Sequence, residues 1–179
     1  MPARRAAFLL ALPALAVVIG ACSNLPVRVG LQDVTIDLGA VTSTQGNVLY
    51  PSAPSAFQKP SLHVSSASID GDVAATGLAS DTSFTFYGRA SDPSQDGNCQ
   101  LVGNLTRTYY ACPASQESAI SGPVTLPADG SSKALHLSGN VLAQGANQGK
   151  LWLGATVEGG ASTGATLHFT HLVASVAVF

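Results

Sequence analysis

The sequence is poor in charged and aromatic residues. Charged residues make up 10% of the 179 residues, against roughly 25% in typical soluble domains, and aromatic residues make up 6%. The 10 acidic residues outnumber the eight Lys and Arg residues, and no segment forms a basic patch. Nucleic-acid binding is therefore disfavoured. Ser, Thr, Asn and Gln must supply most of the hydrated surface, as suits an exported β-protein.

The sequence also lacks the His-Glu-x-x-His motif of zinc proteases and a long hydrophobic run. Its most apolar segment, Ala6 to Ala21, is interrupted by Pro13. A transmembrane helix needs about 20 consecutive apolar residues. This segment is too short for that, which favours a cleaved leader over a retained anchor helix.

The first 22 residues have the layout of a bacterial export signal. A cationic start, Met1-Pro2-Ala3-Arg4-Arg5, precedes the apolar segment, which ends in Ile19-Gly20-Ala21-Cys22. This tetrad resembles the lipobox of bacterial lipoproteins, in which an aliphatic and two small residues precede a lipid-modified cysteine. The resemblance implies a signal peptide over residues 1–21 and a lipidated tether over residues 22–26. It also implies that Cys22 carries a diacylglyceryl group, usually with an amide-linked acyl chain such as palmitate.

Lipidation of Cys22 would fix the location of the protein. One myristoyl chain anchors only marginally, whereas two or three acyl chains give a stable anchor. Ser23 stands where Asp would signal retention at the inner membrane, so the sorting pattern of such lipoproteins favours the outer membrane. The resemblance therefore predicts a cell-envelope protein on the periplasmic or outer surface. Its expected partners are the membrane, through the anchor, and other envelope proteins.

The two cysteines outside the leader form an even pair. With Cys22 lipidated, Cys99 and Cys112 are predicted to form a disulfide, because the envelope is an oxidising compartment. On the chain-entropy model a loop of this size contributes about 3 kcal/mol of stability. The alternative, a redox-active or metal-binding pair, lacks the Cys-x-x-Cys spacing.

The rest of the chain, residues 27–179, predicts one all-β domain. Short segments alternate apolar and polar residues with period two, and Gly, Pro and Asp separate them. No convincing amphipathic helix is predicted, so the one-sided strands must be buried sheet against sheet. We expect an antiparallel β-sandwich, or a small closed barrel, of about eight to ten strands. The clearest strand segments are residues 27–31, 34–38, 61–69, 73–78, 83–89, 124–126, 133–142, 150–157 and 165–179.

Three local predictions concern the connections and one side chain. Residues 39–60, rich in Gly, Ser and Pro, are predicted as a loop that holds at most a short strand at 48–50. The sequence Asp70-Gly71-Asp72 is predicted as a hairpin turn. Trp152 alternates with Leu151 and Leu153, so it is expected on the opposite face of its strand.

One segment resembles the first half of a calcium-binding loop. Asp92, Ser94, Asp96 and Asn98 offer oxygen ligands at alternate positions, and Gly97 allows a sharp turn. The position of the bidentate Glu is occupied by Gly103. The alternative is a polar turn ahead of the disulfide.

Three histidines are candidate ligands for copper or zinc: His136, His168 and His171. Because His168 and His171 are three residues apart, a regular strand sends them to opposite faces, and only a β-bulge would bring them together. The alternative is a set of independent surface histidines.

Taken together, the sequence favours a lipid-anchored lipoprotein with a non-catalytic structural or binding role in an outer-membrane or surface assembly. A secreted metalloenzyme of the copper, superoxide-dismutase-like type that uses the histidines is the second hypothesis. A carrier of a lipid or another apolar ligand in the domain interior is the third.

Overall fold

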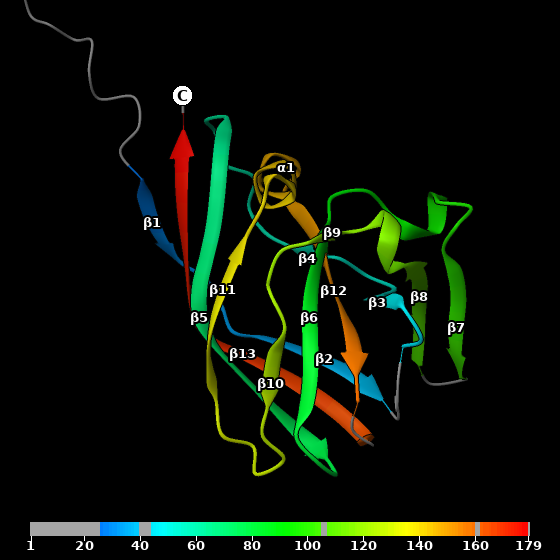
Figure 1. Ribbon diagram of the computed structural model, residues 1–179. Coiled ribbons are helices and arrows are strands. Elements are labelled where there is room, and N and C mark those ends of the chain that lie inside the picture. Colours follow the sequence, from blue (N-terminus) through cyan, green and yellow to red (C-terminus); the bar gives the residue numbers. More distant parts are fainter. Residues whose placement is uncertain (1–25, 40–43, 105–106, 160–161, 179) are drawn as a thin grey trace, which may run out of the picture.

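The computed structural model describes residues 26–39, 44–104, 107–159 and 162–178, so the leader and Cys22 lie outside the described residues. The described chain forms two antiparallel sheets that face each other (Figure 1). The predicted all-β sandwich is confirmed, and because the two sheets stay separate the closed alternative is not formed. No helix in the described ranges is long and apolar enough to cross a membrane.

The first sheet, sheet A, contains five strands in the order β1-β13-β5-β11, with β2 also paired to β13. The strands are β1 (Val27–Gly30), β2 (Val34–Gly39), β5 (Val64–Leu78), β11 (Lys133–Ser138) and β13 (Ser162–Val178). Strand β13 is the centre of this sheet: it pairs with β5 on one side, and with β2 and then β1 on the other.

The second sheet, sheet B, contains eight strands in the order β10-β6-β12-β3-β8-β7, with β4 paired to β12 and β9 to β6. The strands are β3 (Asn47–Pro51), β4 (Ser55–Ala56), β6 (Thr82–Arg89), β7 (Gln100–Asn104), β8 (Arg107–Pro113), β9 (Ser118–Ala119), β10 (Val124–Leu126) and β12 (Lys150–Glu158). Two 3₁₀ turns, η1 (Pro93–Gln95) and η2 (Ala114–Gln116), lie in its connections.

The main core lies between the sheets and follows from the period-two pattern. Buried positions alternate along β6 and recur at every second residue of β13 from Ala165 to Phe169. Their side chains meet face to face: the Phe86 ring packs edge-on against the Phe169 ring from the opposite sheet, with 5.3 Å between centroids. The largest buried members are Phe84, Phe86, Phe169, Leu38, Ile120, Leu126 and Leu167.

A second apolar cluster covers the other face of sheet B. It consists of Val48, Tyr50, Cys112 and Trp152, with Tyr87, Cys99, Tyr110 and Ala114 packed against it. Trp152 points away from the main core, as its alternation predicts, yet it is only 2% exposed because this cluster covers it. Gly154 keeps room for the cluster, since a Cβ there would lie 2.6 Å from the Tyr50 ring.

One turn prediction was wrong. The predicted turn at Asp70-Gly71-Asp72 lies in the middle of the continuous 15-residue strand β5. Gly71 is required there for close approach: β13 bulges opposite it, and a Cβ on Gly71 would lie 2.7 Å from Leu172 Cδ2. The short strand predicted at 48–50 within the loop over 39–60 is confirmed as β3, whose residues Val48 and Tyr50 are fully buried.

The structure also contains a helix that the sequence pattern did not predict. The expected strand over 133–142 ends at Ser138, and α1 (Asn140–Gln148) follows. Its buried residues, Leu142, Ala143 and Gly145, pack against both sheets, so α1 covers one open end of the sandwich (Figure 1). The helix ends at Gly149, whose left-handed conformation lets its N–H reach the carbonyl groups of the last turn.

Candidate functional site

The most organised polar group in the described chain surrounds the guanidinium of Arg89, at the end of β6. Its Nη1 donates to Glu117 Oε1 at 2.9 Å, and its Nε donates to Ser91 Oγ at 3.1 Å. Its Nη2 donates to the carboxylate of Asp96. The Arg89 side chain is 14% exposed and that of Glu117 is 7% exposed. Arg89 is therefore a nearly buried cation between two carboxylates.

This group, which we call the Arg89 clamp (Tyr50, Arg89, Asp96, Cys99, Cys112 and Glu117), joins segments far apart in the sequence. Arg89 lies at the end of β6, Asp96 follows η1, Glu117 follows η2, and Tyr50 lies on β3. Each 3₁₀ turn is followed directly by an acidic residue: Asp96 is the C-cap of η1, and Glu117 is the C-cap of η2. The two short turns thus present both carboxylates to one guanidinium.

Tyr50 on β3 is a further hydrogen-bonding residue of the clamp, along with Arg89, Asp96 and Glu117. Its hydroxyl donates to Glu117 Oε2 at 2.8 Å, so both oxygens of this carboxylate accept a hydrogen bond. Burial, and then the adjacent Glu117 carboxylate, raise the pKa of Tyr50 far above its usual range. The phenol therefore remains a neutral donor. The hydrogen bond from Arg89 to Asp96 lowers the pKa of that carboxyl group, which keeps it ionised.

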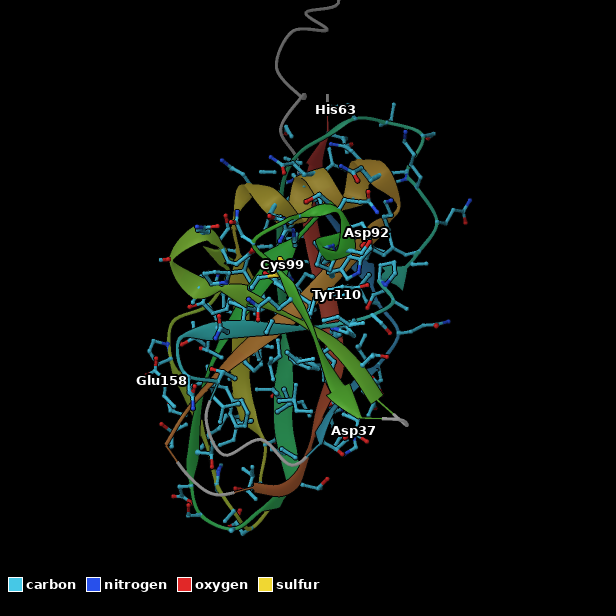
Figure 2. The ribbon with its side chains drawn as sticks, turned by 90° about the vertical axis from the view of Figure 1, so that its right-hand side faces the viewer. Asp37, His63, Asp92, Cys99, Tyr110 and Glu158 are labelled. Carbon is cyan, nitrogen blue, oxygen red and sulfur yellow. A yellow bond between two sulfur atoms is a disulfide. The ribbon has the colours of Figure 1, made fainter. Side chains whose placement is uncertain are left out.

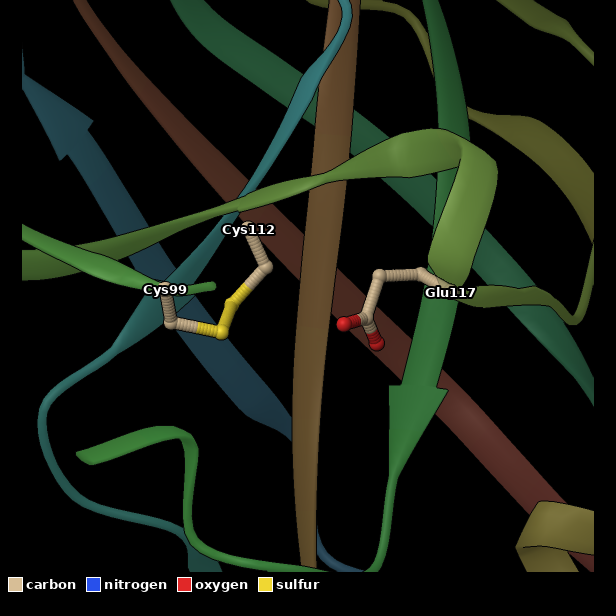
Figure 3. A group of neighbouring side chains, drawn as sticks. All are labelled: Cys99, Cys112 and Glu117. Carbon is tan, nitrogen blue, oxygen red and sulfur yellow. A yellow bond between two sulfur atoms is a disulfide. The ribbon is translucent and has the colours of Figure 1, made fainter. Parts of the chain in front are cut away.

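The predicted disulfide is confirmed and forms part of the clamp. The Cys99 and Cys112 sulfurs are bonded at 2.03 Å, and both lie beside the Glu117 carboxylate (Figure 3). The two sulfurs and a Glu117 oxygen lie within 4.8 Å of one another, and no other three His, Cys, Asp or Glu residues within the described ranges are grouped so closely. However, Arg89 Nη1 lies 3.1 Å from Cys99 Sγ, and the sulfurs are already bonded to each other. An adjacent cation and an intact disulfide favour a structural clamp over a metal centre.

A small hollow opens beside the clamp, between β6 and α1. It has a volume of about 280 Å³, slightly below the range of about 300–1,000 Å³ typical of small-molecule sites. Polar side chains surround it: Arg89, Ser91, Gln116, Glu117, Ser118, Gln144 and Gln148. The guanidinium is already engaged by Asp96, Glu117 and Ser91, and the cysteines are bonded to each other. The hollow can accept a small polar group, but the clamp beside it offers no free nucleophile.

The residues predicted to bind calcium lie in and around the 3₁₀ turn η1. Asp92 caps the start of this turn, and Asp96 belongs to the clamp. Asp92 accepts a hydrogen bond from the Ser94 N–H at 2.8 Å, and this bond lowers the pKa of Asp92. Asp96 accepts from the Asn98 N–H at 3.0 Å and from Arg89. Protein donors thus already satisfy both carboxylates, and the Arg89 cation neutralises one of them. A calcium site here stays a prediction.

The three candidate histidines lie on the outer face of sheet A. Asp70, Asp72 and Thr76 alternate with buried Val73 and Ala75 on β5, so they share that outer face. Each contacts a different histidine: His136 Nδ1 lies 2.7 Å from Asp70, His171 Nδ1 lies 3.1 Å from Asp72, and His168 Nε2 lies 3.4 Å from Thr76.

A bulge in β13 accounts for this shared face. The register shifts between Thr170 and Val173, and His171 adopts a positive φ of 53°. The bulge brings His168 and His171 to one side, but the histidines contact separate β5 side chains rather than a common point. No group of three ligand atoms that includes a histidine lies within 4.8 Å across the part of the chain described. Copper or zinc binding stays a prediction.

A functional or structural role for Arg89, Glu117 or Tyr50 was not predicted from the sequence. The isolated Arg on the aromatic strand segment 83–89 and the single Glu between Cys112 and Val124 were the available signals. A charged residue at the end of a half-buried strand in a charge-poor chain indicates a paired partner, because an unpaired buried charge is very costly.

Comparison with known proteins identifies no family. No family model matches the sequence, and no curated protein sequence matches it. Among solved structures, the structure of the infectious bursal disease virus Gx strain is similar over 88% of this chain and 35% of that chain, with 15% sequence identity and a TM-score of 0.25. A similarity at that TM-score carries no argument about fold or function.

Proposed function

We propose that the protein is a lipid-anchored lipoprotein of the bacterial cell envelope, sorted to the outer membrane, whose β-sandwich has a non-catalytic structural or binding role. The observation that carries this proposal is Cys22, which ends a basic, apolar and small-residue leader five residues before β1 begins. A lipidated Cys22 would hold the folded domain at a bilayer, so membrane anchoring is the first part of the proposed function.

The chemistry of the clamp supports a non-catalytic role. Its cation, its two carboxylates and its phenol bind one another, and its cysteines form a disulfide. A general acid, a general base or a nucleophile must be available to a substrate to act in catalysis. In the clamp the same groups instead stabilise the connections of sheet B, which suits a scaffold that presents its surface to other envelope proteins.

The two alternatives receive less support. The candidate metal ligands His136 and His171 are 62% and 83% exposed in their side chains, and each is hydrogen-bonded to a different aspartate. Buried side chains such as Phe84, Phe86 and Phe169 fill the described interior between the sheets, so no observation there favours a carrier of an apolar ligand. Metal analysis tests the first alternative: about one copper or zinc ion per purified chain would favour the metalloenzyme.

The anchor is tested with the variant Cys22→Ser in the full chain. We expect the variant to leave the membrane fraction, whereas the wild-type chain stays in it and carries the mass of a diacylglyceryl group on Cys22. The matched control is the double variant Cys99→Ser/Cys112→Ser, which removes the other cysteines and should stay membrane-bound. Retention of Cys22→Ser in the membrane fraction would contradict the proposal.

The role in an assembly is tested by isolating the lipidated chain in mild detergent after cross-linking in intact cells. We expect stoichiometric recovery of one or a few envelope proteins. Recovery of the chain alone, at several cross-linker lengths, would count against a role within an assembly.

A further inference from the structure

Exposed apolar side chains lie on β1 and on the segment between β4 and β5. Of the seven large hydrophobic residues exposed in the described chain, Val27 and Val29 lie on β1, Phe57 and Leu62 lie between β4 and β5, and Leu101 lies on β7, away from both. The most exposed of the others are Leu62 at 55%, Val27 at 49%, Val29 at 45% and Phe57 at 43%. We call the surface formed by Val27, Arg28, Val29, Phe57, Lys59 and Leu62 the tether end.

Several contacts bring these segments to one end of the molecule. Val27 on β1 lies opposite Val176, and Val64 on β5 lies opposite Val178, so both strands meet the last residues of β13. The side chain of Asn147 on α1 bonds both the N–H and the carbonyl of Val64, which fixes the segment that follows Leu62. Phe57 N–H donates to the carbonyl of Gly149, just beyond the end of α1. Figure 2 shows His63, next to Leu62, at the top of the molecule, with Asp37 and Glu158 in the lower half.

The segments of the tether end also differ from the rest of the chain in their charged residues. The tether end carries the cations Arg28 and Lys59, and neither its segments nor α1 contain an acidic residue. The acidic residues all lie outside residues 26–31, 57–69, 140–149 and 173–178. They are Asp33, Asp37, Asp70, Asp72, Asp81, Asp92, Asp96, Glu117, Asp129 and Glu158. The segments of the tether end are apolar and carry two cations without an acidic residue, which is complementary to an anionic lipid surface. Asp92 lies close enough to Lys150, the partner of Ala56, to interact with it.

The position of Cys22 selects this occupant over others. Val27 is five positions after Cys22, and a fully extended chain spans at most about 3.6 Å per residue, so Val27 lies within about 18 Å of the lipid attachment point. We infer that the tether end seats on the anionic headgroup surface of the membrane, with Val27, Val29, Phe57 and Leu62 at the interface and Arg28 and Lys59 at lipid phosphates. This inference rests on the proposed lipid anchor and adds a defined orientation to it.

The seating is tested by hydrogen exchange on the lipidated full chain in three media: anionic phosphatidylglycerol vesicles, zwitterionic phosphatidylcholine vesicles and detergent micelles. Each Lys or Arg near an anionic surface contributes about fivefold in affinity. We therefore expect amides in residues 26–31 and 57–64 to exchange at least about fivefold more slowly in anionic vesicles than in zwitterionic ones. Residues 92–118, around the clamp, should exchange equally in all three media.

Matched variants separate seating from general effects. Val27→Ser/Val29→Ser and, separately, Arg28→Gln/Lys59→Gln should abolish the added protection. The controls are Leu101→Ser, an equally exposed apolar residue on β7, and Lys133→Gln, an exposed cation on β11; both should keep the protection.

The outcomes distinguish the seating from the anchor. If mass analysis finds no lipid on Cys22, the proposed function fails. If the lipid is present but exchange at the tether end is the same in all three media, the seating alone is overturned. Protection in micelles that rises with protein concentration would show that a second copy covers this surface and would also overturn the seating.

Discussion

The two faces of sheet B carry apolar clusters that are stabilised in different ways. On the inner face, Phe84 and Phe86 pack against sheet A without any side-chain hydrogen bond. On the outer face, Tyr50 and Trp152 lie beneath a disulfide and beside the Arg89–Glu117 ion pair. The inner cluster depends on non-directional burial, whereas the outer cluster also depends on the hydrogen bonds and ion pairs of the clamp.

This difference determines how each cluster should respond to substitution. Removing atoms from the inner cluster costs stability in proportion to the volume lost, because the neighbours relax only partly. Removing one member of the clamp leaves a buried charge or hydrogen-bonding group without its partner. The loss of stability then depends on the unpaired group that remains rather than on the volume removed. Single and double variants on the two faces test this contrast.

The largest effect is expected for Phe86→Ala in the inner cluster. Phe86 is fully buried and its ring contacts those of Phe84 and Phe169, so the variant should lose about 3–5 kcal/mol of unfolding free energy. Urea denaturation of the purified, disulfide-intact chain measures this loss. The matched control is Phe57→Ala, since Phe57 is 43% exposed and should cost less than about 1 kcal/mol. Equal losses would contradict the assignment of Phe86 to the core.

An intermediate effect is expected for Arg89→Met in the clamp. The variant leaves the Glu117 carboxylate, which is 7% exposed, without its cation, and we expect a loss of about 3 kcal/mol. The double variant Arg89→Met/Glu117→Gln should lose less than the sum of the two single variants, because it leaves no unpaired buried charge. Arg28→Met, on the exposed strand β1, is the control and should change little. Strict additivity in the double variant would show that the two side chains do not interact.

The smallest effect is expected for Tyr50→Phe, and it should depend on pH. At pH 7 the variant loses the hydrogen bond to Glu117 Oε2, which we expect to cost about 1–2 kcal/mol. The pKa of Tyr50 is raised in the folded chain above the usual value of about 10, so the stability that the neutral phenol provides is full below about pH 10 and is lost as the pH rises further. Wild type should therefore lose more stability than Tyr50→Phe between pH 8 and pH 11. Parallel pH profiles, with the disulfide verified as intact, would contradict this role.

The sequence predicted the parts of the fold that depend on alternation. The predicted strand 83–89 matches β6 (Thr82–Arg89), since its residues alternate between a buried face with Phe84 and Phe86 and a half-buried face with Tyr87. The Cys99–Cys112 disulfide was predicted from the even pair of cysteines that remains when Cys22 is set aside. These features need only local pattern and composition.

The parts that were mispredicted depend on contacts between distant residues. Asp70-Gly71-Asp72 has the composition of a turn, but it continues as a strand because Leu172, about a hundred residues later, occupies the space above Gly71. Helix α1 has few apolar residues and two flanking glycines, so its pattern is weak, and its stability comes from packing over both sheets. The Arg89–Glu117 pair joins residues 28 positions apart, and no local pattern specifies such a pairing.

The pairing of β13 has a consequence for the order of assembly. Strands β1 and β2 reach their hydrogen-bonding partner only in residues 162–178, since Val27 pairs with Val176 and Val34 with Phe169. A chain that emerges N-terminus first, from a ribosome or from a translocation channel, therefore carries these strands without a partner until nearly all of it has been delivered. Contacts between such distant residues form slowly, and unpaired strand edges are prone to aggregate. The pairings of β1, β2 and β5 with β13 can therefore form only after residues 162–178 are available, so sheet A is completed late.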